Sequence, residues 1–209
     1  MKYLAIAFIS LFTLKAQAAL ITTFTNQASF LSAAGSTSSY NFDANSISGF
    51  SNQDFGDFSV VATGSGIRLS VLSGGSSSTF SSNHLDFYTD CCNIPDTMTI
   101  TFDNGLLAFG FDFSNEDPTS DYTVLTVDGQ SFNVGTSGTS GFFGLVTDTA
   151  LSSFVFQDDP SNGGANTSTK FDNFLFASNS NDVPEPATLL LFGLGLVGLR
   201  FSNIKRKAV

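Results

Sequence analysis

Residues 98–113 read MTITFDNGLLAFGFDF, and this stretch decides the fold class. Apolar and polar residues alternate from Met98 to Phe102, which is the pattern of a β-strand with one buried face. The alternation breaks at Asp103-Asn104-Gly105, residue types that favour tight turns, and resumes from Phe109 to Phe113. The stretch therefore predicts two antiparallel strands joined by a turn.

A second hairpin is predicted farther along the chain. Residues 122–127 and 132–134 flank Asp128-Gly129, and Asp-Gly readily adopts the positive φ angles of a two-residue turn. Further short strands are expected at residues 40–42, 58–62, 67–72, 85–88, 142–146, 151–156 and 171–176. About ten short strands predict an all-β protein, an antiparallel β-sandwich.

One short helix is expected at residues 26–34, with Asn26 as its N-cap and with Phe30 and Leu31 on one face. Residues 19–177 are numerous enough to bury a core, and we interpret them as one domain. The chain has 24 Phe and no Trp, and many of the Phe residues recur at alternate positions. We therefore expect most of them to form the core of the sandwich.

The N-terminus has the pattern of a secretory signal peptide at residues 1–18. A lysine at position 2 precedes an apolar run at residues 4–14, and Ala16-Gln17-Ala18 supplies the small residues of a cleavage site. We expect export and cleavage between Ala18 and Ala19.

Residues 183–209 form a second signal, which follows a polar linker at residues 178–182. Its parts are Val183-Pro184-Glu185-Pro186, an uncharged run at residues 187–199 and a basic tail at residues 200–207. The thirteen residues of the run would rise about 20 Å as a helix, short of the roughly 30 Å hydrocarbon core of a bilayer. This C-terminal hydrophobic helix is therefore expected to be a marginal membrane span, with its basic end on the cytoplasmic side.

This order of short motif, apolar run and basic cluster resembles the PEP-CTERM sorting signal of Gram-negative bacteria, including the triplet Pro184-Glu185-Pro186. The resemblance implies that an exosortase, a membrane-embedded transpeptidase-like enzyme, recognises the triplet and removes the tail. The protein would then reside at the inner membrane transiently and later at the cell surface or outside the cell. The alternative is a permanent membrane anchor without processing.

Fragments of the body include Tyr40-Asn41-Phe42-Asp43, Phe109-Gly110-Phe111 and Phe171-Asp172-Asn173-Phe174. With these fragments the body resembles the β-sandwich domain common in PEP-CTERM proteins. The resemblance implies a short N-terminal helix followed by a jelly-roll-like pair of sheets.

Without its two signals the chain is strongly acidic. Residues 19–183 contain two cations, Arg68 and Lys170, against seventeen acidic residues, a formal charge of −15. Affinity for nucleic acid comes from Lys and Arg that neutralise phosphate, so the composition argues against nucleic-acid binding.

Few residues are candidates for chemistry. Cys91 and Cys92 are adjacent, and an exported protein allows a strained vicinal disulfide, two free thiols or pairing between chains. His84 is the single histidine, and we interpret it as a solvent-facing or strand-edge residue because no nucleophile or ligand spacing surrounds it. We expect no catalytic residues and no enzymatic activity.

Calcium is the one cofactor that the sequence suggests, although no metal ligands are assigned. Oxygen-bearing side chains gather in two regions, Asn115-Glu116-Asp117 with Asp121, and Asp158-Asp159 with Asn162. A solvated acidic surface explains both regions equally well.

The leading hypothesis is a noncatalytic cell-surface or extracellular-matrix protein that associates with exopolysaccharide. Tyr40, Tyr88 and Tyr122, with Asn and Asp side chains, are the candidates for sugar contacts. The alternative from another class is a secreted hydrolase with paired Asp residues, which would show a cleft of converging carboxylates.

Overall fold

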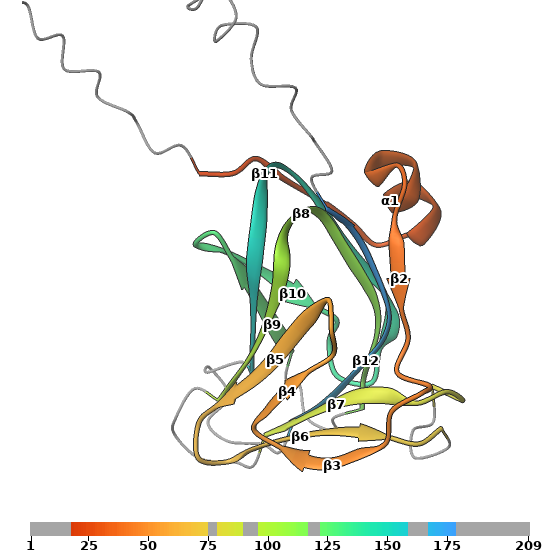
Figure 1. Ribbon diagram of the computed structural model, residues 1–209, viewed down its shortest axis with the longest axis vertical. Coiled ribbons are helices and arrows are strands. Elements are labelled where there is room, and N and C mark those ends of the chain that lie inside the picture. The colour runs from red at the N-terminus through yellow and green to blue at the C-terminus, as the bar shows by residue number, and fades with distance from the viewer. Residues whose placement is uncertain (1–17, 75–78, 90–95, 117–121, 159–166, 179–209) are drawn as a thin grey trace, which may run out of the picture. The chain divides into compact units, whose positions relative to one another are not determined.

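The computed structural model describes residues 18–74, 79–89, 96–116, 122–158 and 167–178, which form one helix and twelve strands (Figure 1). In chain order the elements are β1 (Ile21–Phe24), α1 (Gln27–Ala34), β2 (Ser38–Tyr40), β3 (Ile47–Phe50), β4 (Asn52–Asp54), β5 (Phe58–Thr63), β6 (Ile67–Leu72), β7 (His84–Thr89), β8 (Thr97–Asn115), β9 (Thr123–Val127), β10 (Gln130–Val134), β11 (Ser140–Asp158) and β12 (Thr167–Ser178).

The turn predicted at residues 103–105 is wrong, because β8 runs through it as one strand of 19 residues. β8 pairs with β11 on both sides of the break, through Thr101 with Ser153 and Leu106 with Leu151. Between these pairs β8 has four residues and β11 has one, so the chain bulges and bends instead of reversing. Asp, Asn and Gly suit a bulge as well as they suit a turn.

The second hairpin is confirmed. Val127 pairs with Gln130, and Asp128 and Gly129 have φ angles of 47° and 72°. The strands predicted near β5, β6, β7 and β12 are also found. The two strands predicted at residues 142–146 and 151–156 are one strand, β11, which bends opposite β8. The short strands β1, β3 and β4 were not predicted.

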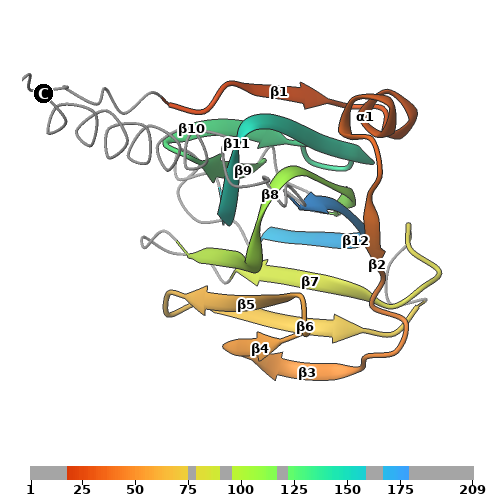
Figure 2. The same ribbon diagram turned by 45° about the horizontal axis from the view of Figure 1, so that its top comes forward.

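The bent strands β8 and β11 give the fold its antiparallel sandwich form. The first half of β8 pairs with β5 and its second half with β12. Similarly, the first half of β11 pairs with β1 and its end with β9. Figure 2 shows β8 and β12 between β1, β9, β10 and β11 on one side and β3 to β7 on the other. Strands that change partners at a bend carry the chain from one layer to the other.

The core is mostly phenylalanine, as expected from the composition. Phe109 and Phe111 alternate with Gly110 and Asp112 along β8, so both rings point into the core and both are fully buried. Phe109 lies with its ring centroid 4.7 Å from that of Phe154 on β11 and 5.3 Å from that of Phe174 on β12. These tilted and edge-on contacts join the central strands of the sandwich.

Helix α1 packs on the outer side of β8 and β11. Asn26 caps it, with its Oδ1 accepting a hydrogen bond of 3.0 Å from the Ser29 amide, as predicted. Phe30 is fully buried, whereas Leu31 is 37% exposed, so the prediction that the two residues share one face is wrong. Phe30 sits over Gly110 and Gly144, which are paired across β8 and β11 and leave room for the ring.

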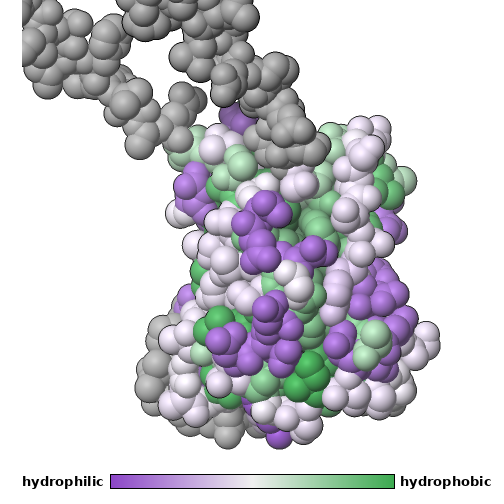
Figure 3. All heavy atoms as spheres, in the orientation of Figure 1, coloured by the Kyte–Doolittle hydropathy of each residue, from purple (hydrophilic) through white to green (hydrophobic). Residues whose placement is uncertain are grey.

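The surface of the described residues is mixed in polarity. In the face shown in Figure 3, hydrophilic residues stand beside hydrophobic ones, and Leu20 and Leu31 are the exposed large apolar residues in the described part of the chain. No helix within the described residues has the length and apolar character needed to cross a membrane. The hydrophobic helix predicted at residues 187–199 lies outside them.

Candidate functional site

A cleft of about 480 Å³ opens where four separate parts of the chain meet. We call it the Asp112 cleft. It is lined by the loop residues Thr79, Phe80, Ser81 and Ser82, by Asp112 and Phe113 of β8, by Ser140, Gly141 and Phe142 of β11, and by Asn173 of β12. Hydroxyl, carboxylate and amide groups therefore face the same space as three aromatic rings.

Asp112 and Asn173 form the polar centre of this cleft. The Asn173 Nδ2 donates a hydrogen bond of 2.8 Å to Asp112 Oδ2, which fixes both side chains. Asn173 has φ = 51° and lies where β12 shifts register against β8. A bulge at this position turns the Asn173 side chain toward Asp112, and Asn tolerates the left-handed backbone better than most residues.

Asp172, the residue before Asn173 on β12, holds two parts of the cleft in place. It pairs with Asp112 across β12 and β8 and is fully buried. Its Oδ1 accepts a hydrogen bond of 2.8 Å from the Asn173 amide, and its Oδ2 accepts one of 2.5 Å from the Ser82 hydroxyl. Asp172 thus holds both the bulge and the loop that lines the cleft, and each of its oxygens already accepts a hydrogen bond.

The pKa of Asp112 is raised above its ordinary value. Partial burial is the largest cause, and the negative charge of Asp172 adds to it. The hydrogen bond from Asn173 acts in the opposite direction. Asp112 is thus a carboxyl group that is half-buried, fixed in position and open to the cleft.

A second cleft adjoins the first and shares part of its lining. It has a volume of about 720 Å³, and we call it the Phe132 cleft. It shares with the Asp112 cleft the residues Phe113, Ser140, Gly141 and Phe142. Its other lining residues are Thr23 and Thr25 near β1, Ser131, Phe132 and Asn133 of β10, Gly135, and Phe143 of β11. The two clefts together offer a run of aromatic rings bordered by hydroxyl and amide groups.

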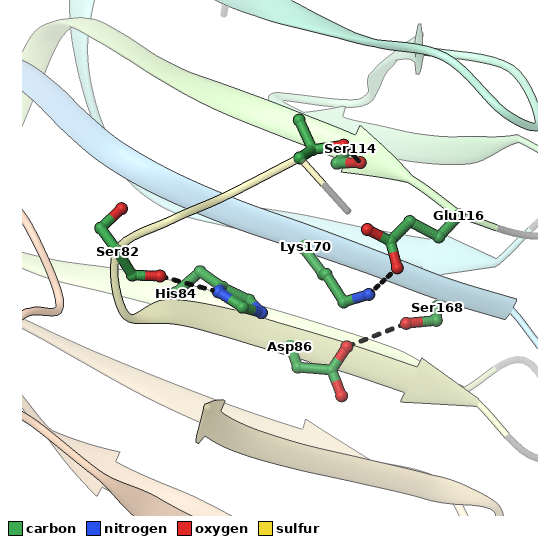
Figure 4. Close-up of polar contacts among 8 residues, drawn as sticks. Ser82, His84, Asp86, Ser114, Glu116, Ser168 and Lys170 are labelled. Atoms are coloured by element: carbon green, nitrogen blue, oxygen red, sulfur yellow. Dashed lines mark hydrogen bonds and ion pairs between the residues drawn. The ribbon is translucent and has the colours of Figure 1, made fainter. Parts of the chain in front are cut away.

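A buried polar cluster lies under this region, on β7, β8 and β12 (Figure 4). Lys170, 5% exposed, forms an ion pair with Glu116 at the end of β8. The Ser168 hydroxyl donates a hydrogen bond of 2.9 Å to Asp86 Oδ1. Burial raises the pKa of Asp86, although Ser168 and the positive charge of Lys170 oppose the shift. These contacts join the strands that carry the cleft.

His84 is fully buried, so its interpretation as a solvent-facing or strand-edge residue is wrong. Its Nδ1 lies 3.1 Å from the carbonyl oxygen of Ser82, which requires a proton on Nδ1, and its Nε2 has no hydrogen-bond partner among the residues that the structure describes (Figure 4). The ring lies against Phe80, with the two ring centroids 5.5 Å apart. His84 therefore supports the loop beneath the Asp112 cleft.

The described residues do not assemble a Ser-His-Asp site. Such a site needs a histidine between the serine hydroxyl and the carboxylate. Here Ser168 donates directly to Asp86, and His84 Nε2 is bonded to neither. Among the residues that line the Asp112 cleft, Asp112 is the one carboxylate, whereas glycoside hydrolysis uses two that flank the scissile bond.

The structure describes only part of the site residues predicted from the sequence. Val183, Pro184, Glu185 and Pro186, and likewise Cys91 and Cys92, lie outside the described residues. Ala18 is exposed, and Ala19 is buried at the start of the domain.

The three tyrosines predicted to contact sugar do not line either cleft. Tyr40 packs against Phe42 and Phe58, and its hydroxyl accepts a hydrogen bond of 2.8 Å from Asn45. Tyr88 lies under the Arg68 guanidinium, 5.0 Å from its carbon to the ring centroid. The aromatic residues that line the two clefts are phenylalanines and not the predicted tyrosines.

The two regions considered for calcium leave the described domain at the same end. Asp158 pairs with Thr123 and Asn115 pairs with Thr169, and the hydroxyls of these two threonines are 2.6 Å apart. The residues 117–121 and 159–166 themselves lie outside the described part. Within that part no group of three His, Cys, Asp or Glu side chains could hold a metal ion. Calcium binding stays a prediction.

Comparison with known proteins adds one assignment, at the C-terminal end. Residues 182–207 match the PEP-CTERM protein-sorting motif. This motif indicates a secreted protein that an exosortase handles at the membrane, in agreement with the sequence analysis. The match covers the sorting signal and leaves the function of the sandwich open.

The search of curated proteins finds no match to this chain. Among solved structures, a family 29 carbohydrate binding module is similar at a TM-score of 0.41 and 16% identity, over 68% of this chain and 88% of that chain. A variant of the module CBM29-2 is similar at a TM-score of 0.41 and 18% identity, over 67% of this chain and 91% of that chain. TM-scores this low carry neither fold nor ligand over to this chain.

Proposed function

We propose that this chain is an exported, noncatalytic protein of the cell surface or extracellular matrix that binds polysaccharide in the Asp112 and Phe132 clefts. On this proposal an exosortase sorts and processes it through the PEP-CTERM motif. The observation that carries the binding proposal is the pair Asp112 and Asn173, fixed by a 2.8 Å hydrogen bond beside Phe113 and Phe142.

The lining of the clefts suits a sugar chain. A sugar ring has an apolar face that packs on an aromatic ring and a rim of hydroxyls that need donors and acceptors. Phe80 and Phe132 supply the partly exposed rings, Phe113 and Phe142 are each 8% exposed, and Asp112, Asn173 and Ser140 supply acceptors and donors. The side chains of Asp112 and Asn173 are held before a ligand arrives, so ordering them costs little on binding.

The charges favour an uncharged polysaccharide. Arg68 and Lys170 are the cations of residues 19–183, and neither lines a cleft. Arg68 lies over Tyr88, and Lys170 is paired with Glu116. An acidic polymer would therefore bring its carboxylates toward Asp112 with no cation to compensate them.

A secreted hydrolase is the second candidate, because Asp112 has a raised pKa, as a general acid requires. Against it, Asp172 is fully buried and both of its oxygens already accept hydrogen bonds. Release of reducing ends from the bound polymer would favour the hydrolase, and binding without release favours the proposal.

The binding proposal is tested by sedimentation of the exported protein with the exopolysaccharide of its own host. Asp112→Asn removes the charge and one strong acceptor, and we expect it to weaken binding about five- to tenfold, the equivalent of one hydrogen bond. Asp103→Asn is the matched control, because Asp103 is an exposed residue of the same strand outside both clefts. Equal binding by the two variants would place the polysaccharide elsewhere. Repeating the assay in EDTA tests the calcium prediction.

The sorting proposal is tested by the intact mass and location of the native protein. Removal of the tail by an exosortase predicts a product that lacks residues 187–209 and that no longer fractionates with the inner membrane. Replacement of Pro184-Glu185-Pro186 by alanines should leave the full tail and retain the protein at the membrane. A native product that keeps the tail would instead favour the permanent anchor.

A further inference from the structure

The first residues of the described domain are held by side chains from distant parts of the chain. The Ala19 amide nitrogen lies 2.7 Å from Asp128 Oδ2, and the Ala19 carbonyl accepts a hydrogen bond of 2.8 Å from Gln130 Nε2. Ala19 is 5% exposed. Asp128 stands in the turn between β9 and β10, 109 residues away along the chain. Ala19 therefore occupies a built site on this hairpin.

The next residue, Leu20, is held in a similar way by β11, the strand that pairs with β9. The Leu20 amide donates a hydrogen bond of 2.9 Å to Asp148 Oδ1 on β11, and β1 then pairs with β11 from Ile21 onward. Figure 2 shows β1 running beside the β9–β10 hairpin. The carboxylates that face the start of the domain are thus Asp128 and Asp148, and the third contact, Gln130, is neutral.

We propose that signal-peptide cleavage between Ala18 and Ala19 creates the group that this site is built to hold, an α-ammonium paired with Asp128. Hydrolysis by a signal peptidase adds water across the Ala18–Ala19 peptide bond. Ala18 leaves as a carboxylate, and the Ala19 nitrogen takes up protons to become a cation at neutral pH. An amide with one proton is replaced at the same place by a charged group with three, and a charge-assisted hydrogen bond to a carboxylate is the stronger contact.

The burial of Ala19 fixes the order of events. A peptidase cannot reach a bond next to a residue held between Asp128 and Gln130, so cleavage precedes docking. The exported chain then completes its fold with its own new terminus, and this links export to stability.

The pairing predicts a specific dependence of stability on pH. A free α-amino group has a pKa of about 7.7–8.0, and a carboxylate partner in the folded state raises it. A raised pKa of a cation means that the stabilisation is fully present below the unfolded pKa and is lost as pH rises through the folded pKa. The contribution of Asp128 should therefore be lost as the pH rises from about 8 through the folded pKa.

The chain offers a well-matched pair of variants. Asp128→Asn removes the charge and keeps the turn, because Asn-Gly is a preferred sequence for this type of hairpin. Asp148→Asn is the control: it makes the same change beside Leu20, whose nitrogen remains an uncharged amide after cleavage.

The test uses the exported protein purified from its native host and has two readings. Mass spectrometry of the N-terminal peptide should show Ala19 as the first residue. At pH 6 the denaturation midpoints of the wild type and of Asp148→Asn should lie above that of Asp128→Asn. Between pH 6 and pH 10 they should fall toward the midpoint of Asp128→Asn, so that the difference between them is closed at pH 10. A terminus at any other residue would overturn the proposal, and so would an Asp128→Asn difference that is the same at pH 6 and pH 10.

Discussion

Asn173 is the residue at which backbone geometry and the candidate site meet. It is one of two non-glycine residues with positive φ in the described part of the chain, and its side chain holds Asp112. Backbone of this kind away from a tight turn often marks a functional position. The sequence offered one signal of it, since Asp172-Asn173 interrupts a run that otherwise reads as an apolar strand.

Two substitutions at Asn173 separate the effect of its left-handed backbone on stability from the effect of its side-chain amide. Asn173→Ala should be less stable than Asn173→Gly by about 1 kcal/mol, because an L side chain pays for the left-handed conformation and glycine does not. At Asn133, an exposed residue within β10 whose φ is negative, the order should reverse. Urea denaturation of the four variants measures both differences. Equal stability of Asn173→Ala and Asn173→Gly would contradict the strained geometry.

Asp112 should make the protein less stable as the pH rises from acid toward neutral. Its folded pKa is raised above the ordinary value of an aspartate, so the folded state holds this proton after the unfolded chain has released it. The cost of ionising the half-buried carboxyl thus appears as the pH passes from about 3.9 through the folded pKa. Asp112→Asn should gain stability relative to the wild type over this range, as measured by urea denaturation at a series of pH values. The exposed Asp103→Asn serves as the control, and an identical gain there would remove the role of burial.

At the scale of elements, glycine decides how α1 docks. A Cβ on Gly144 would lie 2.6 Å from Phe30 Cδ2 and 2.9 Å from Phe142 Cε1, both too close. We expect Gly144→Ala to cost about 1–3 kcal/mol through overpacking. A Cβ on Gly141 would meet its nearest atom at 3.6 Å, so Gly141→Ala is a mild control. Phe30→Leu in the Gly144→Ala background should recover part of the loss in thermal denaturation, and no recovery would mean that the clash lies elsewhere.

The ion pair between β12 and the end of β8 gives a second prediction at this scale. Lys170→Met removes the ion pair with Glu116 and a positive charge that lowers the pKa of Asp86. We expect a loss of about 1.5–3 kcal/mol in the free energy of unfolding, the size of one hydrogen bond between charged groups. Adding Glu116→Gln should restore part of it. A double variant as unstable as the single one would assign the loss to packing of the lysine stem.

The sequence predicted elements well where the signal was local. Asp128-Gly129 supplies both positive φ angles of its turn, and Asn26 supplies its cap, so the second hairpin and α1 were found. β8 and β11 were each divided in two, because Asp103-Asn104-Gly105 has the composition of a turn and only pairing with the partner strand decides that the chain continues. The clefts could not be foreseen, since Asp112 and Asn173 are 61 residues apart and meet through strand pairing and a bulge.

At the scale of the whole molecule, a sorting motif is combined with an acidic surface. The PEP-CTERM motif at residues 182–207 indicates a secreted protein, and residues 19–183 carry a formal charge of −15. Its clefts contain rings, hydroxyls and one carboxylate among the described residues, and no cation. Such a surface would repel acidic polymers in the matrix while leaving neutral chains free to bind.

The most direct test of this account measures binding of the native exported protein to a set of purified polysaccharides at low ionic strength. The set contains neutral polymers, a uronic acid polymer and a partly deacetylated amino-sugar polymer, with sedimentation as the readout. The account predicts binding to at least one neutral polymer, weakened about five- to tenfold by Asp112→Asn and unchanged by Asp103→Asn. Binding to the uronic acid polymer or to the cationic polymer alone, or to none of the set, would contradict it.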